Sequence, residues 1–110
     1  MAVSGDLFIG SQRVKKAETF FASSAATGQK LEPAFSAAGP EEIERACSLA
    51  WSAFHTYREI DLELRARFLE TAADQIMALG DELLERAHAE SGLPLARLTG
   101  ERGRTVGQLR

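Results

Sequence analysis

This sequence of 110 residues has few of the features that mark disulfide-bonded, membrane-spanning or secreted proteins. Its single cysteine, Cys47, excludes a disulfide within the chain, and a reducing compartment is the default for such a protein. No apolar run approaches the roughly 18 residues that a membrane span requires. Residues 1–6 lack the basic and apolar segments of a secretory signal. We therefore expect a cytoplasmic protein with no membrane partner.

The charge is modest overall but unevenly distributed. The formal net charge of −3 is too small to indicate a nucleic-acid partner, and 45% hydrophobic with 26% charged residues indicates a globular chain. Residues 41–90 carry twelve acids and five bases, a balance of −7, whereas residues 97–110 carry four arginines and one glutamate, a balance of +3. Such asymmetry marks either a site that attracts anions or faces that neutralise each other in the fold.

The first third of the chain has the pattern of β-hairpins. Within residues 7–14, two short β-prone stretches flank Gly10, which tolerates the positive φ of a tight turn. Residues 19–22 and 30–35 predict a second pair of strands. Pro33 lacks the amide hydrogen that a central strand would donate, so the returning strand is expected at an edge.

The hydrophobic period becomes helical near residue 39. Pro40 suits a first helical turn, the Asp61 side chain can cap a second helix, and Gly80 can end that helix in a left-handed conformation. A third, shorter helix opens at residue 81 and breaks at residues 91–92, and a last helical segment begins at residue 94. The sequence thus predicts a mainly α chain with N-terminal β-hairpins: a hairpin region over 1–38 and a region of about four helices over 39–110.

The last segment is unusual in its glycines. Gly100, Gly103 and Gly107 would share one face of a helix, and each costs about 0.8–1.0 kcal/mol relative to alanine. We expect this face to allow close approach by another backbone or by a ligand; the alternative is that the stretch forms a loop. Residues 104–110 also read as the middle of a helix without a stop signal, which predicts a longer polypeptide.

Residues that could carry chemistry are isolated from one another. His55 and His88 have no second histidine or cysteine at metal-ligand spacing, and no nucleophile elbow, dinucleotide fingerprint or phosphate loop is present. We expect Cys47 to be a buried filler and Trp51 to be a packing residue. Cys47 belongs to an apolar stripe on the first helix, which we expect to face a core: Ile43, Ala46, Cys47, Ala50, Phe54 and Tyr57. No catalytic, cofactor-binding or metal-binding residue is therefore predicted within the chain.

Short pieces of sequence follow one another in a familiar order. They are Leu-Phe-Ile-Gly (7–10) and Arg-Val (13–14), Ala-Thr-Gly (26–28), Ala46 with Ala50 and Phe54, Arg-Ala-Arg-Phe-Leu (65–69), Gly-Asp-Glu-Leu (80–83) and Glu-Ser-Gly (90–92). Together they resemble the N-terminal segment of the aldehyde dehydrogenase family, although Ser24 and Ala25 stand where that family has Asn-Pro. Residues 90–94 and 100–110 look most like its α-ketoglutaric semialdehyde (2,5-dioxovalerate) dehydrogenase branch.

The resemblance implies an α/β enzyme several times longer than this chain. Residues 39–110 would form part of its cofactor-binding domain, and the partners would be the remainder of the polypeptide and further copies in a homo-oligomer. In that family a cysteine forms a thiohemiacetal, hydride passes to NAD or NADP, and a glutamate assists hydrolysis. Those two residues lie beyond residue 110, and neither Cys47 nor Glu90 matches them. The chain alone is therefore expected to bind no cofactor and to be inactive.

One substrate-binding hypothesis follows from the resemblance. The helix after the Glu-x-Gly motif runs near the substrate tunnel in this family, and Arg104 and Gln108 lie four residues apart on it. A guanidinium pairs well with a carboxylate, so both residues are candidate contacts for a dicarboxylate-like aldehyde; ordinary surface contacts are the alternative. The rival for the whole chain is a non-catalytic helical interaction module or a self-associating truncated product, because unpartnered apolar faces drive association.

Overall fold

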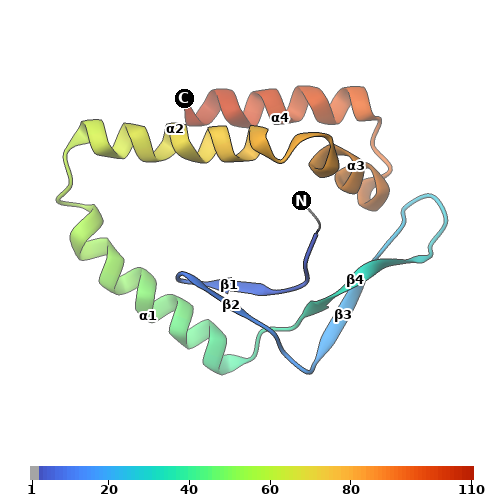
Figure 1. The fold of residues 1–110 in the computed structure, drawn as a ribbon, viewed down its shortest axis with the longest axis horizontal. Coiled ribbons are helices and arrows are strands. Elements are labelled where there is room, and N and C mark those ends of the chain that lie inside the picture. The colour runs from blue at the N-terminus through green and yellow to red at the C-terminus, as the bar shows by residue number, and fades with distance from the viewer. Residues whose placement is uncertain (1–2) are drawn as a thin grey trace. The chain divides into compact units, whose positions relative to one another are not determined.

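The computed structural model describes residues 3–110, which contain four short strands followed by four helices (Figure 1). The strands are β1 (Leu7–Ile9), β2 (Gln12–Val14), β3 (Thr19–Ser23) and β4 (Lys30–Ser36). The helices are α1 (Pro40–Tyr57), α2 (Leu62–Ala78), α3 (Gly80–Ser91) and α4 (Leu95–Leu109). A mostly helical chain with two small antiparallel hairpins confirms that part of the expected fold class.

These elements form two compact units by their contacts. The first, called the hairpin unit, comprises residues 3–22 and 30–60, and the second, called the helical unit, comprises residues 23–29 and 61–110. Helix α1 thus groups with the hairpins. The expected division into regions 1–38 and 39–110 describes secondary structure, and as a division into domains it stays a prediction.

In the hairpin unit, β1 and β2 pair antiparallel in the register that the sequence indicates. Leu7 lies opposite Val14 and Ile9 opposite Gln12, so Gly10 occupies the turn with a φ of 62°. Strands β3 and β4 form the second two-stranded sheet. Pro33 lies inside β4, which a two-stranded sheet tolerates because each strand has an unpaired edge. Both predicted hairpins are confirmed.

A close backbone contact holds the N-terminal segment to β4. The Ser36 amide donates to the Gly5 carbonyl oxygen at 2.8 Å, and Ser36 itself is buried. A Cβ added to Gly5 would lie 1.7 Å from the Ala34 carbonyl oxygen and 2.9 Å from the Phe35 Cα. Because these neighbours are backbone atoms that cannot swing away, this position accepts no side chain larger than that of glycine.

Helix α1 departs most from expectation. Its six apolar residues at helical spacing, called here the α1 stripe, are all exposed, and the helix buries no residue: Ile43, Ala46, Cys47, Ala50, Phe54 and Tyr57. The predictions that Cys47 is buried and that Trp51 packs inside are wrong for the described chain, since Trp51 is 69% exposed. The reason is that α1 contacts the three-residue strand β1, where Leu49 approaches Gly10, and this strand covers a different side of the helix.

In the helical unit, the helices begin and end close to the residues that the sequence indicates. The Asp61 Oδ1 atom accepts a hydrogen bond from the Leu64 amide at 2.9 Å, which caps α2 as expected. Gly80 has the expected positive φ of 65°, although it is the first residue of α3 and not the last of α2. Gly92 ends α3 in the left-handed conformation with a φ of 76°.

The last segment is a helix, so the loop alternative is wrong. Helix α4 packs on α2 and α3, and Figure 1 shows it lying alongside α2. Ala73, Leu84 and Val106 supply the buried side chains of the unit, one from each helix. Among residues 3–110, none of the helices is long and apolar enough to span a bilayer.

Candidate functional site

Helix α4 presents two faces of different character. Leu98, Arg102 and Val106 recur every four residues on the side that packs against the other helices, and Val106 is 5% exposed. The Arg102 Nη1 atom donates to the Gly80 carbonyl oxygen at 3.1 Å. The inner face is therefore committed to holding the helical unit together.

The outer face of α4 carries the three glycines and is open. Gly100, Gly103 and Gly107 are all exposed, and a Cβ added to any of them would meet no atom within 4 Å. The prediction that these glycines share one face of a helix is thus confirmed, and this face is exposed. No described residue approaches it closely, so the expected approach by a backbone or a ligand stays a prediction about something outside residues 3–110.

Arg104 and Gln108 lie exposed beside this glycine face, four residues apart. The other arginines of the α4 region are engaged: Arg97 lies 3.9 Å from Glu101, Arg102 reaches Gly80, and the Arg110 Nη2 atom lies 2.8 Å from the Asp74 Oδ1 atom. Arg104 forms no ion pair or hydrogen bond with the residues that the structure describes. Its guanidinium can offer a two-pronged set of donors to a carboxylate.

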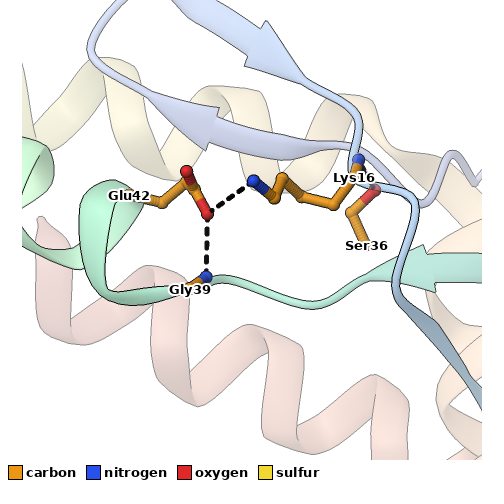
Figure 2. Close-up of polar contacts among 4 residues, drawn as sticks. All are labelled: Lys16, Ser36, Gly39 and Glu42. Carbon is orange, nitrogen blue, oxygen red and sulfur yellow. Dashed lines mark hydrogen bonds and ion pairs between the residues drawn. The ribbon is translucent and has the colours of Figure 1, made fainter.

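A second polar cluster joins the loop after β2 to the start of α1 (Figure 2). The Glu42 Oε1 atom accepts a hydrogen bond from the Gly39 amide at 2.8 Å and lies 3.1 Å from the Lys16 Nζ atom. The Lys16 amide donates to the Ser36 hydroxyl oxygen at 3.0 Å. Lys16 and Glu42 form an ion pair with each other, so the cluster, called here the brace, links separate segments of the hairpin unit. The sequence alone did not predict it.

The cluster sets the protonation behaviour of Glu42. The hydrogen bond from the Gly39 amide, followed by the hydrogen bond from Lys16, lowers the pKa of Glu42 below its ordinary value. A lowered carboxyl pKa stabilises the folded chain above the unfolded pKa, and this stability is lost as the pH falls through the folded pKa. The brace therefore weakens in acid.

We expect Glu42→Gln to reduce the melting temperature of the chain near neutral pH, because the amide keeps an acceptor for Gly39 but loses the charge that Lys16 meets. The difference from the unsubstituted chain should shrink as the pH falls from about 6 to about 3, where the glutamate itself becomes protonated. Thermal unfolding followed by circular dichroism across this range measures it. Glu41→Gln, at the exposed neighbour, is the control, and a Glu42→Gln difference that does not change with pH contradicts the assignment.

The remaining candidate groups do not assemble into a site in the described chain. Cys47 lies in a surface hollow of about 560 Å³ whose lining comes from α1 and includes no basic side chain that would favour a thiolate. His55 is exposed beside Trp51 and Phe54, and His88 is exposed at the end of α3, where its Nδ1 atom lies 2.6 Å from the Leu93 carbonyl oxygen. Among residues 3–110, no three potential ligands gather to hold a metal ion.

The sequence that forms these hairpins and helices matches a known class of enzyme. Residues 13–110 match the sequence model of the aldehyde dehydrogenase family, and the chain belongs to this family. It is 53% identical, over its whole length, to alpha-ketoglutaric semialdehyde dehydrogenase 2 of Azospirillum brasilense, and it covers 21% of that enzyme.

Two further relatives show the same partial coverage. The chain is 43% identical to alpha-ketoglutaric semialdehyde dehydrogenase of Acinetobacter baylyi, with 97% of the chain and 20% of the relative aligned. It is 33% identical to the mitochondrial succinate-semialdehyde dehydrogenase of Rattus norvegicus, with 88% and 18% aligned. The chain therefore spans about a fifth of the length of these relatives and corresponds to an N-terminal fragment of such an enzyme.

Proposed function

We propose that this chain is the N-terminal part of an NAD(P)-dependent dehydrogenase that oxidises an aldehyde bearing a carboxylate to the dicarboxylate, with 2,5-dioxovalerate as the candidate substrate. Membership of the family and the names of its relatives support the reaction class. The observation that carries the substrate class is Arg104, an exposed cation beside an open glycine face, without a partner among the described residues.

The residues of this chain do not fit a dinucleotide site. Such a site needs a parallel strand–helix–strand unit with a glycine-rich turn at the helix N-terminus. Within residues 3–110 the strands pair as antiparallel hairpins, and Gly100, Gly103 and Gly107 lie inside a helix. We therefore place cofactor binding and the reacting side chains in the remaining polypeptide, and assign this chain a role in substrate recognition and in the architecture of the enzyme.

The chemistry of the relatives' substrates makes a guanidinium a sensible contact. α-Ketoglutaric semialdehyde and succinate semialdehyde, the substrates in the names of the relatives, each have an aldehyde at one end and a carboxylate at the other. A planar guanidinium binds a carboxylate through two parallel hydrogen bonds, which fixes both its position and its orientation. In the proposed role, Arg104 holds the distal carboxylate and Gln108 adds a neutral donor one turn further along.

The test replaces Arg104 by alanine in a complete dehydrogenase that carries this N-terminal segment. Loss of a charge-assisted contact of about 1.5–3 kcal/mol should raise KM for the semialdehyde roughly tenfold or more. KM for an uncharged aldehyde of similar length should change little. Steady-state kinetics on both substrates measure the difference. Arg97→Ala is the matched control, because Arg97 is exposed on the same helix and lies near Glu101; equal effects of Arg104→Ala on both aldehydes would reject the proposal.

A second candidate function has one observation in its favour. Large apolar side chains stay exposed in this chain, among them Phe8 at 69%, Trp51 at 69% and Leu62 at 76%, and such surfaces drive self-association. The rival proposal is therefore a non-catalytic module that assembles through these faces. Sedimentation of the isolated chain over a range of concentrations distinguishes the two, because the rival predicts defined oligomers of the chain by itself. Homo-oligomeric assembly of the enzyme and a cytoplasmic location stay predictions from the sequence.

A further inference from the structure

Two arginines on the inner face of α4 tie this helix to distant parts of the helical unit. Arg102, Val106 and Arg110 follow one another at intervals of four residues, so they lie on one side of the helix, where Val106 is buried. The Arg102 Nη1 atom donates to the Gly80 carbonyl oxygen at 3.1 Å, across 22 residues of sequence. The Arg110 Nη2 atom donates to the Asp74 Oδ1 atom at 2.8 Å, across 36 residues. The buried side chain therefore has a polar tie on each side of it.

The bond from Arg102 is the better protected of these two ties. Arg102 is partly buried and lines a mostly apolar hollow of about 330 Å³ between α2, α3 and α4. An arginine stem packs well on such apolar atoms, while its guanidinium still needs a polar acceptor. Gly80 is the first residue of α3 and comes two positions after the end of α2, so one hydrogen bond fixes α4 against the junction of both helices. The pair of Arg110 and Asp74 is exposed, and such pairs contribute less.

The direction of the Arg104 side chain depends on how firmly the inner face is held. With 3.6 residues in each turn, Arg104 lies about 200° around the helix from Arg102, on the side that faces away from the packing. A helix with its side chains is about 10–12 Å across, so a rotation of about 10° moves a group at its surface by about 1 Å. A misplacement of that size at a substrate can cost an enzyme roughly 100-fold in rate.

We infer that Arg102 is a positioning residue for the proposed substrate site. Its hydrogen bond to Gly80 fixes the rotation of α4 and thereby the place of the Arg104 guanidinium, which receives the carboxylate of the aldehyde. The inference rests on the proposed function, because it needs Arg104 to contact the substrate. Arg110, through Asp74, is a second and weaker support of the same helix. Arg102 acts through Arg104 and does not contact the substrate, since it lies on the opposite side of α4.

The experiment uses a chimaera in which residues 1–110 replace the matching segment of the Azospirillum brasilense enzyme. Arg102→Met removes the guanidinium and keeps an unbranched stem that fills the apolar hollow. Steady-state kinetics are measured with succinate semialdehyde and with butanal, which have carbon chains of the same length and differ in the distal carboxylate. Arg97→Ala is the matched control, because the pair of Arg97 and Glu101 lies within α4 and holds no other helix.

The expected result for Arg102→Met is that KM for succinate semialdehyde rises about fivefold or more, whereas kcat and KM for butanal stay within about twofold. In an Arg104→Ala background the same substitution should have no further effect, because no guanidinium remains to be displaced. Arg102→Lys should recover most of the loss, since a single carbonyl oxygen needs one donor and not a planar fork. Arg97→Ala should change neither KM.

A purely structural role of Arg102 gives different results. An equal rise of KM for both aldehydes, or effects of Arg102→Met and Arg104→Ala that multiply in the double variant, overturns the inference. An unchanged KM for succinate semialdehyde in Arg102→Met, together with a selective rise in Arg104→Ala, overturns the inference alone and leaves the proposed function standing. A folded chimaera without activity, or an Arg104→Ala variant without a selective effect, counts against the proposed function and overturns the inference with it.

If Arg102→Met leaves no soluble enzyme, Asp74→Asn takes its place in the same measurements. Asp74 is exposed, and its replacement removes the charge that Arg110 meets without touching the inner packing. A rise in KM of about twofold or more for succinate semialdehyde alone, absent in the Arg104→Ala background, supports the inference. An equal change for both aldehydes, or no change for either, overturns it.

Discussion

Replacing Gly5 by alanine is expected to lower the free energy of unfolding of the hairpin unit by about 3 kcal/mol, the upper end of the cost of overpacking. The added Cβ would lie 1.7 Å from the Ala34 carbonyl oxygen, far inside any tolerated contact. Relief requires the N-terminal segment to move away from β4, which breaks the hydrogen bond from the Ser36 amide to the Gly5 carbonyl oxygen. The added methyl group is therefore expected to detach the N-terminal segment from β4.

Denaturant unfolding measures the loss, and hydrogen exchange at the Ser36 amide locates it. Ser4→Ala is the control, because Ser4 is exposed next to Gly5 and its replacement by alanine adds no atoms. The contact would be refuted by a Gly5→Ala chain that unfolds at the same denaturant concentration as the unsubstituted one. Hydrogen exchange at the Ser36 amide that stays slow in Gly5→Ala would also refute the contact.

On the outer face of α4, replacing glycine by alanine is expected to raise the free energy of unfolding instead of lowering it. Replacing Gly100, Gly103 and Gly107 together by alanine should stabilise the isolated chain by about 2–3 kcal/mol, since each exchange in a helix interior recovers up to about 1 kcal/mol. The space for each Cβ is empty to 4 Å, so no clash opposes the gain. Denaturant unfolding of the isolated chain gives the size of the effect.

The same triple substitution tests whether the glycine face serves a partner. In a complete dehydrogenase we expect it to reduce activity or soluble yield, because three methyl groups would fill a surface that something approaches closely. Gly92→Ala is a useful contrast in the isolated chain: its φ of 76° disfavours a side chain, so this substitution should destabilise. Unchanged activity of the triple variant would mean that the glycines have no role in the complete enzyme.

The features that sequence reasoning located correctly depend on residues close together in the chain. Gly10 marks the first turn, Asp61 caps the helix that follows it, and Gly92 ends α3, each through a conformational preference of its own backbone or of the next few residues. The helical period likewise depends on neighbours three and four positions apart. Such features can be predicted from the sequence without knowledge of the tertiary structure.

What could not be predicted depends on partners that lie far apart in sequence. Pro40 marked the start of α1, but the approach of Lys16 to Glu42 depends on how the hairpins fold back toward α1. The exposure of Cys47 has a similar cause, because a periodic stripe shows that a helix has an apolar side and does not show which element covers it.

The candidate site follows the same pattern. Its position on one side of α4 was predictable from the spacing of Arg104 and Gln108. The distinction between Arg104 and the other arginines was not, because Arg102 and Arg110 are engaged by residues 22 and 36 positions away. Charge counts alone treat these arginines as equivalent, and the contacts of the fold separate them.

The packing of α2, α3 and α4 also bears on how the polypeptide folds as it is synthesised. These helices are consecutive in sequence, and their mutual contacts span at most a few tens of residues. Contacts of low sequence separation form quickly, and N-terminal parts of a long chain fold first as they leave the ribosome. The bundle that ends at residue 109 thus offers an early nucleus, ready before the greater part of the dehydrogenase has been translated.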